Sequence, residues 1–464
     1  MGRTAAYAQA VRAENPFTLF VDAGDDHEKG SVAEELSHGA STKQIVHAMG
    51  FDVRVLGNHD FGWGPAHVLD FSRDPTALVL SSNVEYVGSS PSDFGGMEYG
   101  EITVGCLRVG FFGMVTEPWA ANDRQVTADY FPEFSCRYDY VARAEELVQQ
   151  HRPGVDLLVM VSHLGIGTDQ KIAERVSGID LILGGHTHTV LENPQVVAST
   201  VIVHAGSHGS HVARLDLTFD LQAPTWLGYS HELLPNQPRA LPSDPALEAR
   251  IAQIVRQSAP HAQRSVFHLE RALNGREVAR LAARASVEVL SADAAFVDPA
   301  RVQREWRRGG VSQQQLLDTF QIEHHPPGTP GDTSMYVVSM AGRDLRRLRR
   351  ERSHWGYAGP TDIVPSLQYS VGLQKHMALH ATEYLPAGIR ARNPEFASEL
   401  WRVVEAYGRG RVADHLGIAA AEMPHQSRTC RVSGTNLSPT AAVQVAKSWS
   451  GLDAEEASWP RCRR

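Results

Sequence analysis

The chain has 464 residues, a formal net charge of −9 and 42% hydrophobic residues, and this length predicts two to three domains rather than one. The mild negative charge gives no basic footprint for nucleic acid, and the arginine-rich text at residues 343–350 is more typical of a solvated helix face than of an RNA site. No apolar run approaches the roughly 18 residues of a membrane span, and no signal peptide is visible at Met1.

The first predicted element is a helix over residues 4–13, which are rich in alanine and carry apolar residues at helical spacing. It leads into an apolar run at residues 17–21 that is typical of a strand. A helix followed by a strand is the second half of a βαβ crossover, yet no first strand precedes it in the printed sequence.

Four short apolar runs each give way to a loop that carries potential metal ligands. Such runs predict strands buried on both faces of a sheet. Ligands in open α/β sheets collect beyond the carboxyl ends of strands, so we expect the four loops to converge on one rim, where glycine lets the backbone turn sharply. The runs are residues 17–21, 53–56, 157–161 and 181–183, and the loop signals are Gly24-Asp25, Gly57-Asn58-His59-Asp60, Ser162-His163 and Gly184-Gly185-His186-Thr187-His188.

These loops offer the donors of a hydrolytic metal centre. Divalent Mn, Fe, Co and Zn accept imidazole nitrogen together with carboxylate or amide oxygen. The carboxylate of Asp25 can bridge two ions, and Asn58 can supply a neutral oxygen, while His163 and His186 can supply nitrogens. His188 lies two residues beyond His186, and in an extended segment this spacing places both side chains on one side, facing two neighbouring ions.

His59 follows Asn58 directly, so it can reach a scissile ester without binding metal. It is our candidate general acid for the leaving oxygen. The alternative for any single histidine is an ordinary surface or core role, because the chain has 22 of them. We therefore rely on the ordered set of four loops and leave the histidines at 204, 208 and 211 unassigned.

The text around these loops resembles the calcineurin-like metallophosphoesterases, specifically the bacterial 5′-nucleotidase branch. The resemblance implies an α/β fold, an α+β sandwich of four layers, and a bimetal centre that hydrolyses phosphate esters of nucleotides. It implies that Asp25 bridges the ions, that Asn58, His163 and His186 complete one site, and that His188 belongs to the other. Family members are usually periplasmic or extracellular, and this sequence leaves the compartment open. The matching segments are residues 21–31, 49–64, 81–84, 161–169, 178–189 and 201–220.

The sequence departs from the family pattern at two places. Relatives open with a strand ending in Asp-x-His, which supplies two ligands to the first metal site, and this text has no such motif. One site then keeps only Asp25 and His188, so the sequence leaves open one bound ion or two. Relatives also carry an Asp that orients the catalytic histidine where this chain has Gly62, and we expect Asp60 to be its substitute.

The chain divides into four predicted parts. Residues 1–225 form the catalytic domain with its first strand missing, and residues 226–262 form a proline-punctuated linker with a helix at residues 243–257. Ser243 is the expected N-cap of that helix. Residues 263–412 resemble the family's smaller α/β nucleotide-specificity domain, and the tail at 413–464 is expected to be poorly ordered.

In the second domain, Phe320 and Tyr384 match the two rings with which relatives clamp a base. Stacking of this kind is worth about 1–3 kcal/mol per base. The alternative is that both rings pack in the core. Arg304 is the candidate for phosphate or sugar contacts, although the family's Gly-Gly-x-Arg text is absent there. The nucleotide site is therefore expected to be altered or lost.

The predicted function is a metal-dependent phosphoester hydrolase that resembles 5′-nucleotidase, with a metal-activated water attacking phosphorus and His59 protonating the leaving oxygen. Its partner is a small nucleotide or phosphate ester. Two alternatives stay open: a degenerate or truncated homologue that binds metal or nucleotide without turnover, and a related hydrolase for another ester, such as a cyclic nucleotide, a nucleotide sugar or a sulfur-linked substrate. The sequence does not define the oligomeric state.

Overall fold

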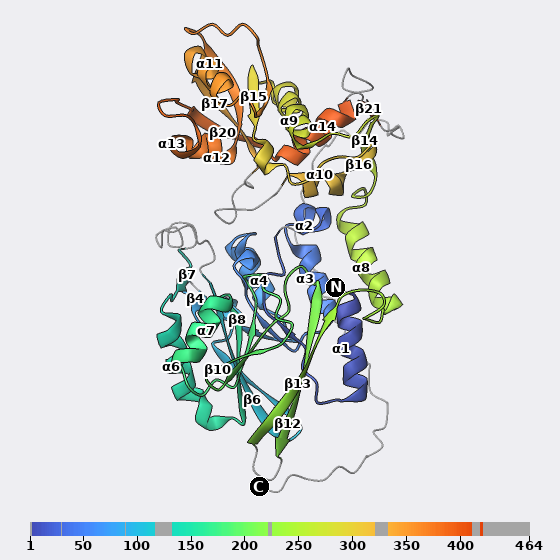
Figure 1. Cartoon of the computed structure of the whole chain (residues 1–464), viewed down its shortest axis with the longest axis vertical. Helices are drawn as coiled ribbons and strands as arrows, with labels where there is room; N and C mark the ends of the chain where they lie inside the picture. The colour runs from blue at the N-terminus through green and yellow to red at the C-terminus, as the bar shows by residue number, and fades with distance from the viewer. Residues whose placement is uncertain are drawn as a thin grey trace, which may run out of the picture.

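The computed structural model describes residues 2–28, 30–88, 90–116, 132–220, 225–320, 333–410 and 418–420. Apart from residues 418–420, the predicted tail lies outside these ranges. The chain forms an N-terminal domain and a C-terminal domain, which lie at opposite ends of the long axis (Figure 1). Within the described residues, no helix combines the length and apolar character needed to cross a bilayer.

Two sheets pack face to face in the N-terminal domain. One is parallel, in the order β1-β2-β3, and the other has the order β10-β11-β9-β8-β6-β5 with antiparallel edges. The strands are β1 (Val21–Asp22), β2 (Val53–Val55), β3 (Leu78–Leu80), β5 (Tyr99–Val104), β6 (Leu107–Val115), β8 (Leu157–His163), β9 (Leu181–Gly184), β10 (Gln195–Val197) and β11 (Thr200–His204). The sheets share a core of aliphatic and aromatic side chains from both inner faces, including Val53, Leu80, Phe111 and Val159.

Helices cover the outer face of each sheet, which completes the predicted four layers (Figure 1). The predicted helix at residues 4–13 is confirmed as α1, although the predicted strand at 17–21 is reduced to the two-residue edge strand β1. The helices on the first sheet are α1 (Gly2–Glu14), α3 (Ala40–Met49) and α4 (Pro65–Ser72), and those on the second are α6 (Tyr140–His151) and α7 (Ile166–Arg175). The smaller elements are η1 (His59–Phe61), β4 (Val84–Tyr86), η2 (Pro91–Asp93), β7 (Phe134–Cys136) and η3 (Arg152–Gly154).

A long antiparallel ribbon of β12 (His211–Asp220) and β13 (Thr225–Pro235) closes the N-terminal domain. Residues expected to begin the linker therefore belong to a strand. The reason is that alternate apolar side chains of the ribbon, such as Leu215 and Trp226, pack against the core between the two sheets. Helix α8 (Pro245–Ser258) then runs toward the second domain (Figure 1).

The C-terminal domain is built on two smaller sheets, in the orders β18-β15-β19-β17-β20 and β16-β14-β21. Its strands are β14 (Ser265–Leu269), β15 (Ala294–Val297), β16 (Gly309–Ser312), β17 (Met335–Ala341), β18 (Gly356–Ala358), β19 (Gln368–Gln374), β20 (Arg392–Ser398) and β21 (Ile418–Ala420). Its helical segments are α9 (Gly275–Leu290), η4 (Pro299–Arg301), α10 (Gln313–Thr319), α11 (Gly342–Glu351), α12 (Lys375–Leu379), α13 (Ala381–Tyr384) and α14 (Leu400–Gly410).

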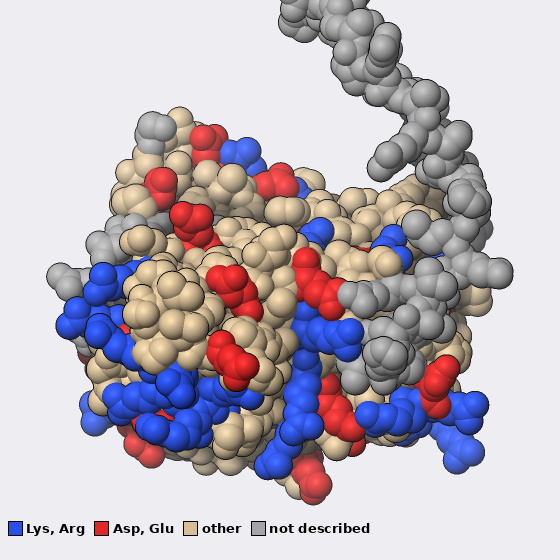
Figure 2. Space-filling model, turned by 90° about the horizontal axis from the view of Figure 1, so that it is seen from above, with Lys and Arg blue, Asp and Glu red and all other residues tan. Residues whose placement is uncertain are grey.

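The arginine-rich text forms helix α11, as predicted. Leu345 and Leu348 of this helix are buried, and Arg347 pairs with Glu351 at 2.7 Å. Figure 2, which views this end of the molecule, shows basic side chains interspersed with acidic ones. The arrangement is that of a solvated amphipathic helix.

Helix α2 (Val32–Ser37) joins the two domains. Val32 and Ala33 are fully buried within the hydrophobic cluster of the C-terminal domain. The backbone N–H of Val32 donates to Gln314 Oε1 on α10 at 3.0 Å. The loop that carries Asp25 therefore runs directly into the contact between the domains.

The N-cap of α8 is Asp244 rather than the predicted Ser243. Its carboxylate accepts the backbone N–H groups of Ala246 at 2.8 Å and Leu247 at 3.2 Å. Pro245 occupies the first helical position, so the residue directly before it takes the capping place.

We expect Asp244→Ala to weaken the first turn of α8 by about 1 kcal/mol, because the capping bonds to the free N–H groups are lost. Native-state hydrogen exchange should then be roughly fivefold faster for the first-turn amides of α8. Ser243→Ala is the matched control and should leave that exchange unchanged. An equal or larger effect of Ser243→Ala would contradict the assignment of the cap.

Candidate metal centre

The four predicted loops meet where β1, β2, β8 and β9 end. Asp25 Oδ2 lies 2.9 Å from His163 Nε2, and Asn58 Oδ1 lies 3.1 Å from His186 Nδ1. Asp25, His163 and His186 each offer one ligand atom, and these atoms all lie within 4.8 Å of one another. Each sheet of the sandwich thus contributes two loops to a single cluster of oxygen and nitrogen donors.

Several residues of these loops adopt left-handed backbone conformations. Asp25 has φ 65°, Glu28 61°, His186 72° and His188 57°. Such values are uncommon outside glycine and carry strain of order 1–3 kcal/mol each. These strained residues gather around one cluster of donors. This indicates a site where backbone strain is accepted so that the side chains take their positions.

Two glycines allow the first two loops to touch through their backbones. A Cβ on Gly24, whose φ is +85°, would lie 2.7 Å from the nitrogen of Gly57. A Cβ on Gly57 would lie 2.2 Å from Asp25 Oδ1. Any side chain at either position would therefore push the Asp25 loop away from the Asn58 loop.

His163 is oriented in the manner of a metal ligand. Its Nδ1 lies 2.5 Å from the carbonyl oxygen of Ala23, and because a carbonyl can only accept, Nδ1 carries the hydrogen. Nε2 is then the lone-pair nitrogen of the neutral ring. This buried atom lies 2.9 Å from Asp25 Oδ2. A carbonyl that fixes the tautomer in this way is the usual support of a ligating histidine.

The charges in the cluster are strongly coupled. Burial raises the pKa of Asp25, but the charge and hydrogen bond of His163 outweigh it and lower the pKa below its usual value. Burial lowers the pKa of His163, but Asp25 raises it above the usual value. Burial, with the charge of His163, lowers the pKa of His186 to about 4. His186 is therefore neutral near pH 7, which is the form that binds metal.

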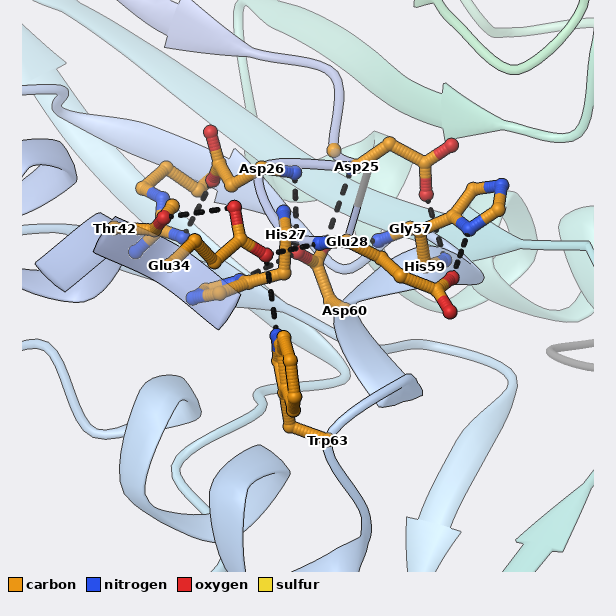
Figure 3. A network of polar contacts seen from close by, with 12 residues as sticks. Asp25, Asp26, His27, Glu28, Glu34, Thr42, Gly57, His59, Asp60 and Trp63 are labelled. Atoms are coloured by element: carbon orange, nitrogen blue, oxygen red, sulfur yellow. Dashed lines mark hydrogen bonds and ion pairs between the residues drawn. The ribbon is translucent and has the colours of Figure 1, made fainter. Parts of the chain in front are cut away.

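Asp60 lies beneath the cluster and is fully buried. Its carboxylate accepts the backbone N–H groups of Asp25 (3.1 Å), Asp26 (3.1 Å), His27 (3.1 Å) and Gly57 (2.7 Å), and also contacts His27 Nδ1 at 2.9 Å. Figure 3 shows it between the two loops. Burial raises the pKa of Asp60, but the hydrogen bond and charge of His27 lower it to about 2.

The carboxylate that the structure places against His59 Nδ1 is that of Glu28, whereas Asp60 was the residue expected there. The Glu28 carboxylate contacts His59 Nδ1, whereas the Asp60 oxygens are directed to the backbone of the loops (Figure 3). The sequence analysis missed Glu28. Its signal was the polar run from Asp26 to Glu28 combined with the glycine at position 62.

His188 stands apart from the group formed by Asp25, His163 and His186. It is exposed, and its ring centroid lies 5.3 Å from that of His208. The spacing argument assumed an extended segment, but both His186 and His188 have positive φ, so the loop turns between them. The extended geometry that the spacing argument assumed is therefore not the one that the loop adopts.

A buried polar group that the sequence analysis did not identify supports the second pair of loops. Asp169 accepts from the hydroxyl of Ser162 and lies 2.8 Å from His204 Nε2. A Cβ on Gly184 would fall 2.1 Å from that His204 nitrogen. This packing holds the ends of β8 and β9 against each other.

The predicted substrate residues of the C-terminal domain differ in exposure. Phe320 is fully buried, with its ring centroid 6.2 Å from that of Trp306, so it offers no face to a base in this structure. Tyr384 is 39% exposed and packs against His376 at 5.0 Å. The side chain of Arg304 is 66% exposed. Core packing, the alternative considered from the sequence, therefore describes Phe320.

Comparison with known proteins agrees with the fold and the cluster. Residues 2–190 match the family model of the calcineurin-like phosphoesterases. A snake venom 5′-nucleotidase from Gloydius brevicauda is 29% identical over 194 residues, which cover 41% of this chain and 32% of that protein. The 5′-nucleotidase of Bos taurus is 25% identical over 272 residues, 54% of this chain and 46% of that protein. The chain thus spans less than half the length of these relatives.

A solved structure, a 5′-nucleotidase precursor from Thermus thermophilus, superposes with a TM-score of 0.64 at 20% identity, over 88% of this chain and 90% of that chain. The fold of both domains therefore matches. Residues 2–190 therefore match the calcineurin-like phosphoesterases. The two curated relatives are named 5′-nucleotidases and the superposed structure is named a 5′-nucleotidase precursor, so the predicted resemblance is confirmed.

We expect Asp60→Asn to destabilise the N-terminal domain by about 3–5 kcal/mol, because an amide leaves the loop N–H groups and the His27 ring without their anion. The pKa of Asp60 is lowered in the folded protein, so its contribution is present above the usual value of 3.8 and is lost as pH falls through about 2. Urea unfolding should show a constant deficit from pH 5 to 7 that shrinks below about pH 4.

Asp156→Asn is the control for this change. Asp156 accepts the backbone N–H of Arg108 at 2.7 Å in a solvent-exposed hydrogen bond, so its loss should be small. A deficit for Asp60→Asn that equals the control, or that is the same at pH 3 and pH 7, would contradict the role given to Asp60.

Proposed function

We propose that this protein is a metal-dependent phosphoester hydrolase that releases phosphate from nucleotides. The single observation that carries the proposal is the meeting of Asp25, His163 and His186 in one donor cluster. The family of the N-terminal domain and the names of the curated relatives support the same reaction class.

The residues present suit a divalent ion of the Mn, Fe, Co or Zn kind. The cluster combines one carboxylate with two imidazoles, and Asn58 adds an amide oxygen beside His186. The ring of His186 is neutral near pH 7 and binds an ion without losing a proton, and Nε2 of His163 is the nitrogen that its ring turns toward Asp25. When bound, such ions would polarise a phosphate and lower the pKa of a coordinated water.

His59 is assigned as the general acid. Its side chain is 18% exposed at the edge of the cluster, so one edge of the ring can reach an ester. Its backbone N–H donates to Asp25 Oδ1 at 2.8 Å, which ties its place to that of the carboxylate ligand. Protonation of the leaving oxygen by a placed imidazolium contributes typically 10²–10⁴-fold in rate.

The pocket for the rest of the substrate belongs to the same proposal. Asp25 and the other proposed ligands would hold the ion that binds the phosphate. Tyr384 and Arg304 are exposed side chains of the second domain that are candidates for contact with the nucleoside. Because Phe320 lies in the core, Tyr384 is the one ring of the predicted pair that is exposed for stacking on a base.

The test compares wild type with His186→Ala, using p-nitrophenyl phosphate and AMP with added Mn²⁺. We expect His186→Ala to lose about 100-fold or more in kcat/KM for both esters and to retain less metal by elemental analysis, because one ligand is removed. His261→Ala, at an exposed position outside the cluster, is the control and should match wild type. Equal turnover by wild type and His186→Ala would overturn the proposal.

A further inference from the structure

Glu28 is a buried carboxylate aimed at the proposed general acid. It contacts His59 Nδ1, and its side chain is only 2% exposed, whereas the His59 side chain is 18% exposed. The carboxylate is thus the more buried of the two groups, and Figure 3 shows it against one nitrogen of the His59 ring.

The backbone of Glu28 is held in an unusual conformation by a second buried carboxylate. Glu28 has φ 61°, and its N–H donates to Glu34 Oε1. Glu34 is 3% exposed and also accepts from Trp63 Nε1 at 3.1 Å and Thr42 Oγ1 at 3.0 Å (Figure 3). Strain in a non-glycine residue persists only where the surroundings determine it, as they do here.

Gly62 leaves the space that the Glu28 carboxylate occupies. A Cβ at position 62 would lie 2.9 Å from Glu28 Cδ and 3.1 Å from the His59 carbonyl oxygen. The backbone of Gly62 is ordinary, with φ −54° and ψ −33°, so its conformation does not require glycine. What excludes a side chain at position 62 is the carboxyl group of Glu28.

We propose that Glu28 is the positioning residue for His59. Its carboxylate reaches the imidazole from the first loop and occupies the space that a side chain at position 62 would need. A carboxylate only accepts, so Glu28 holds a hydrogen on His59 Nδ1 and directs Nε2 outward to the ester. In the protonated ring, Nε2 carries the second hydrogen, which passes to the leaving oxygen. This inference rests on the proposed function, in which His59 donates the proton.

The test is a double-mutant cycle of wild type, Glu28→Ala, Gly62→Asp and the double variant. Glu28→Ala should lower kcat by about 10- to 100-fold with little change in KM. Gly62→Asp alone should also lower kcat, because its Cβ crowds Glu28. The double variant should recover activity over both single variants, because the carboxylate introduced at position 62 then enters the space that Glu28 leaves. Glu174→Ala, an exposed glutamate on α7, is the control.

The choice of ester separates positioning from general damage. Phenyl phosphate releases phenol, whose pKa is about 10, as for the tyrosine side chain. Because this leaving oxygen is more basic than that of p-nitrophenyl phosphate, its release depends more on the general acid. Glu28→Ala should therefore lose more activity on phenyl phosphate. Wild-type rates for Glu28→Ala on both esters would overturn the inference, and so would a double variant no better than Glu28→Ala.

A second readout keeps the two proposals distinguishable. If wild type with Mn²⁺ turned over neither ester, the proposed function would fall, and ¹⁵N NMR of labelled histidine would still decide the role of Glu28. We expect the His59 ring of wild type to hold one tautomer, with hydrogen on Nδ1, and the Glu28→Ala ring to exchange between both. The same His59 ring shifts in both proteins would overturn the inference.

Discussion

The fully buried carboxylate of Asp60 is the interaction on which the site depends. It accepts N–H groups from the loop after β1 and from the loop after β2, and it lies against the His27 ring. A single anion thereby fixes two chain segments that lie far apart in sequence. Charge-assisted hydrogen bonds in a water-poor interior are strong, and they offset the backbone strain at Asp25 and Glu28.

The buried carboxylates in this region therefore make different contacts and have different roles. Asp60 organises the backbone, Glu34 holds the strained turn, and Glu28 contacts the His59 ring. Asp25 supplies the carboxylate of the donor cluster. Because α2 follows this loop and carries Val32 into the core of the second domain, the site and the contact between the domains share one segment of chain.

The sequence predicted the loops that form the cluster, because short apolar strands and glycine-bounded loops are local signals. The four-layer sandwich was predicted from the family resemblance. It did not predict the place of His188, since a left-handed turn at His186 depends on tertiary packing. The role of Glu28 was also hidden, because its partner lies 31 positions away and the link is a contact in space. Phe320 shows the same limit: a ring at a matching position was placed in the core by Trp306 and its neighbours.

The most direct measurement is anomalous diffraction from crystals of the full chain grown with Mn²⁺. The account predicts a peak within coordination distance of Asp25, His163 and His186, with the Asp60 carboxylate still bound to the loop N–H groups and making no contact with the ion. Strong Mn²⁺ peaks elsewhere, with none between those three side chains, would contradict it.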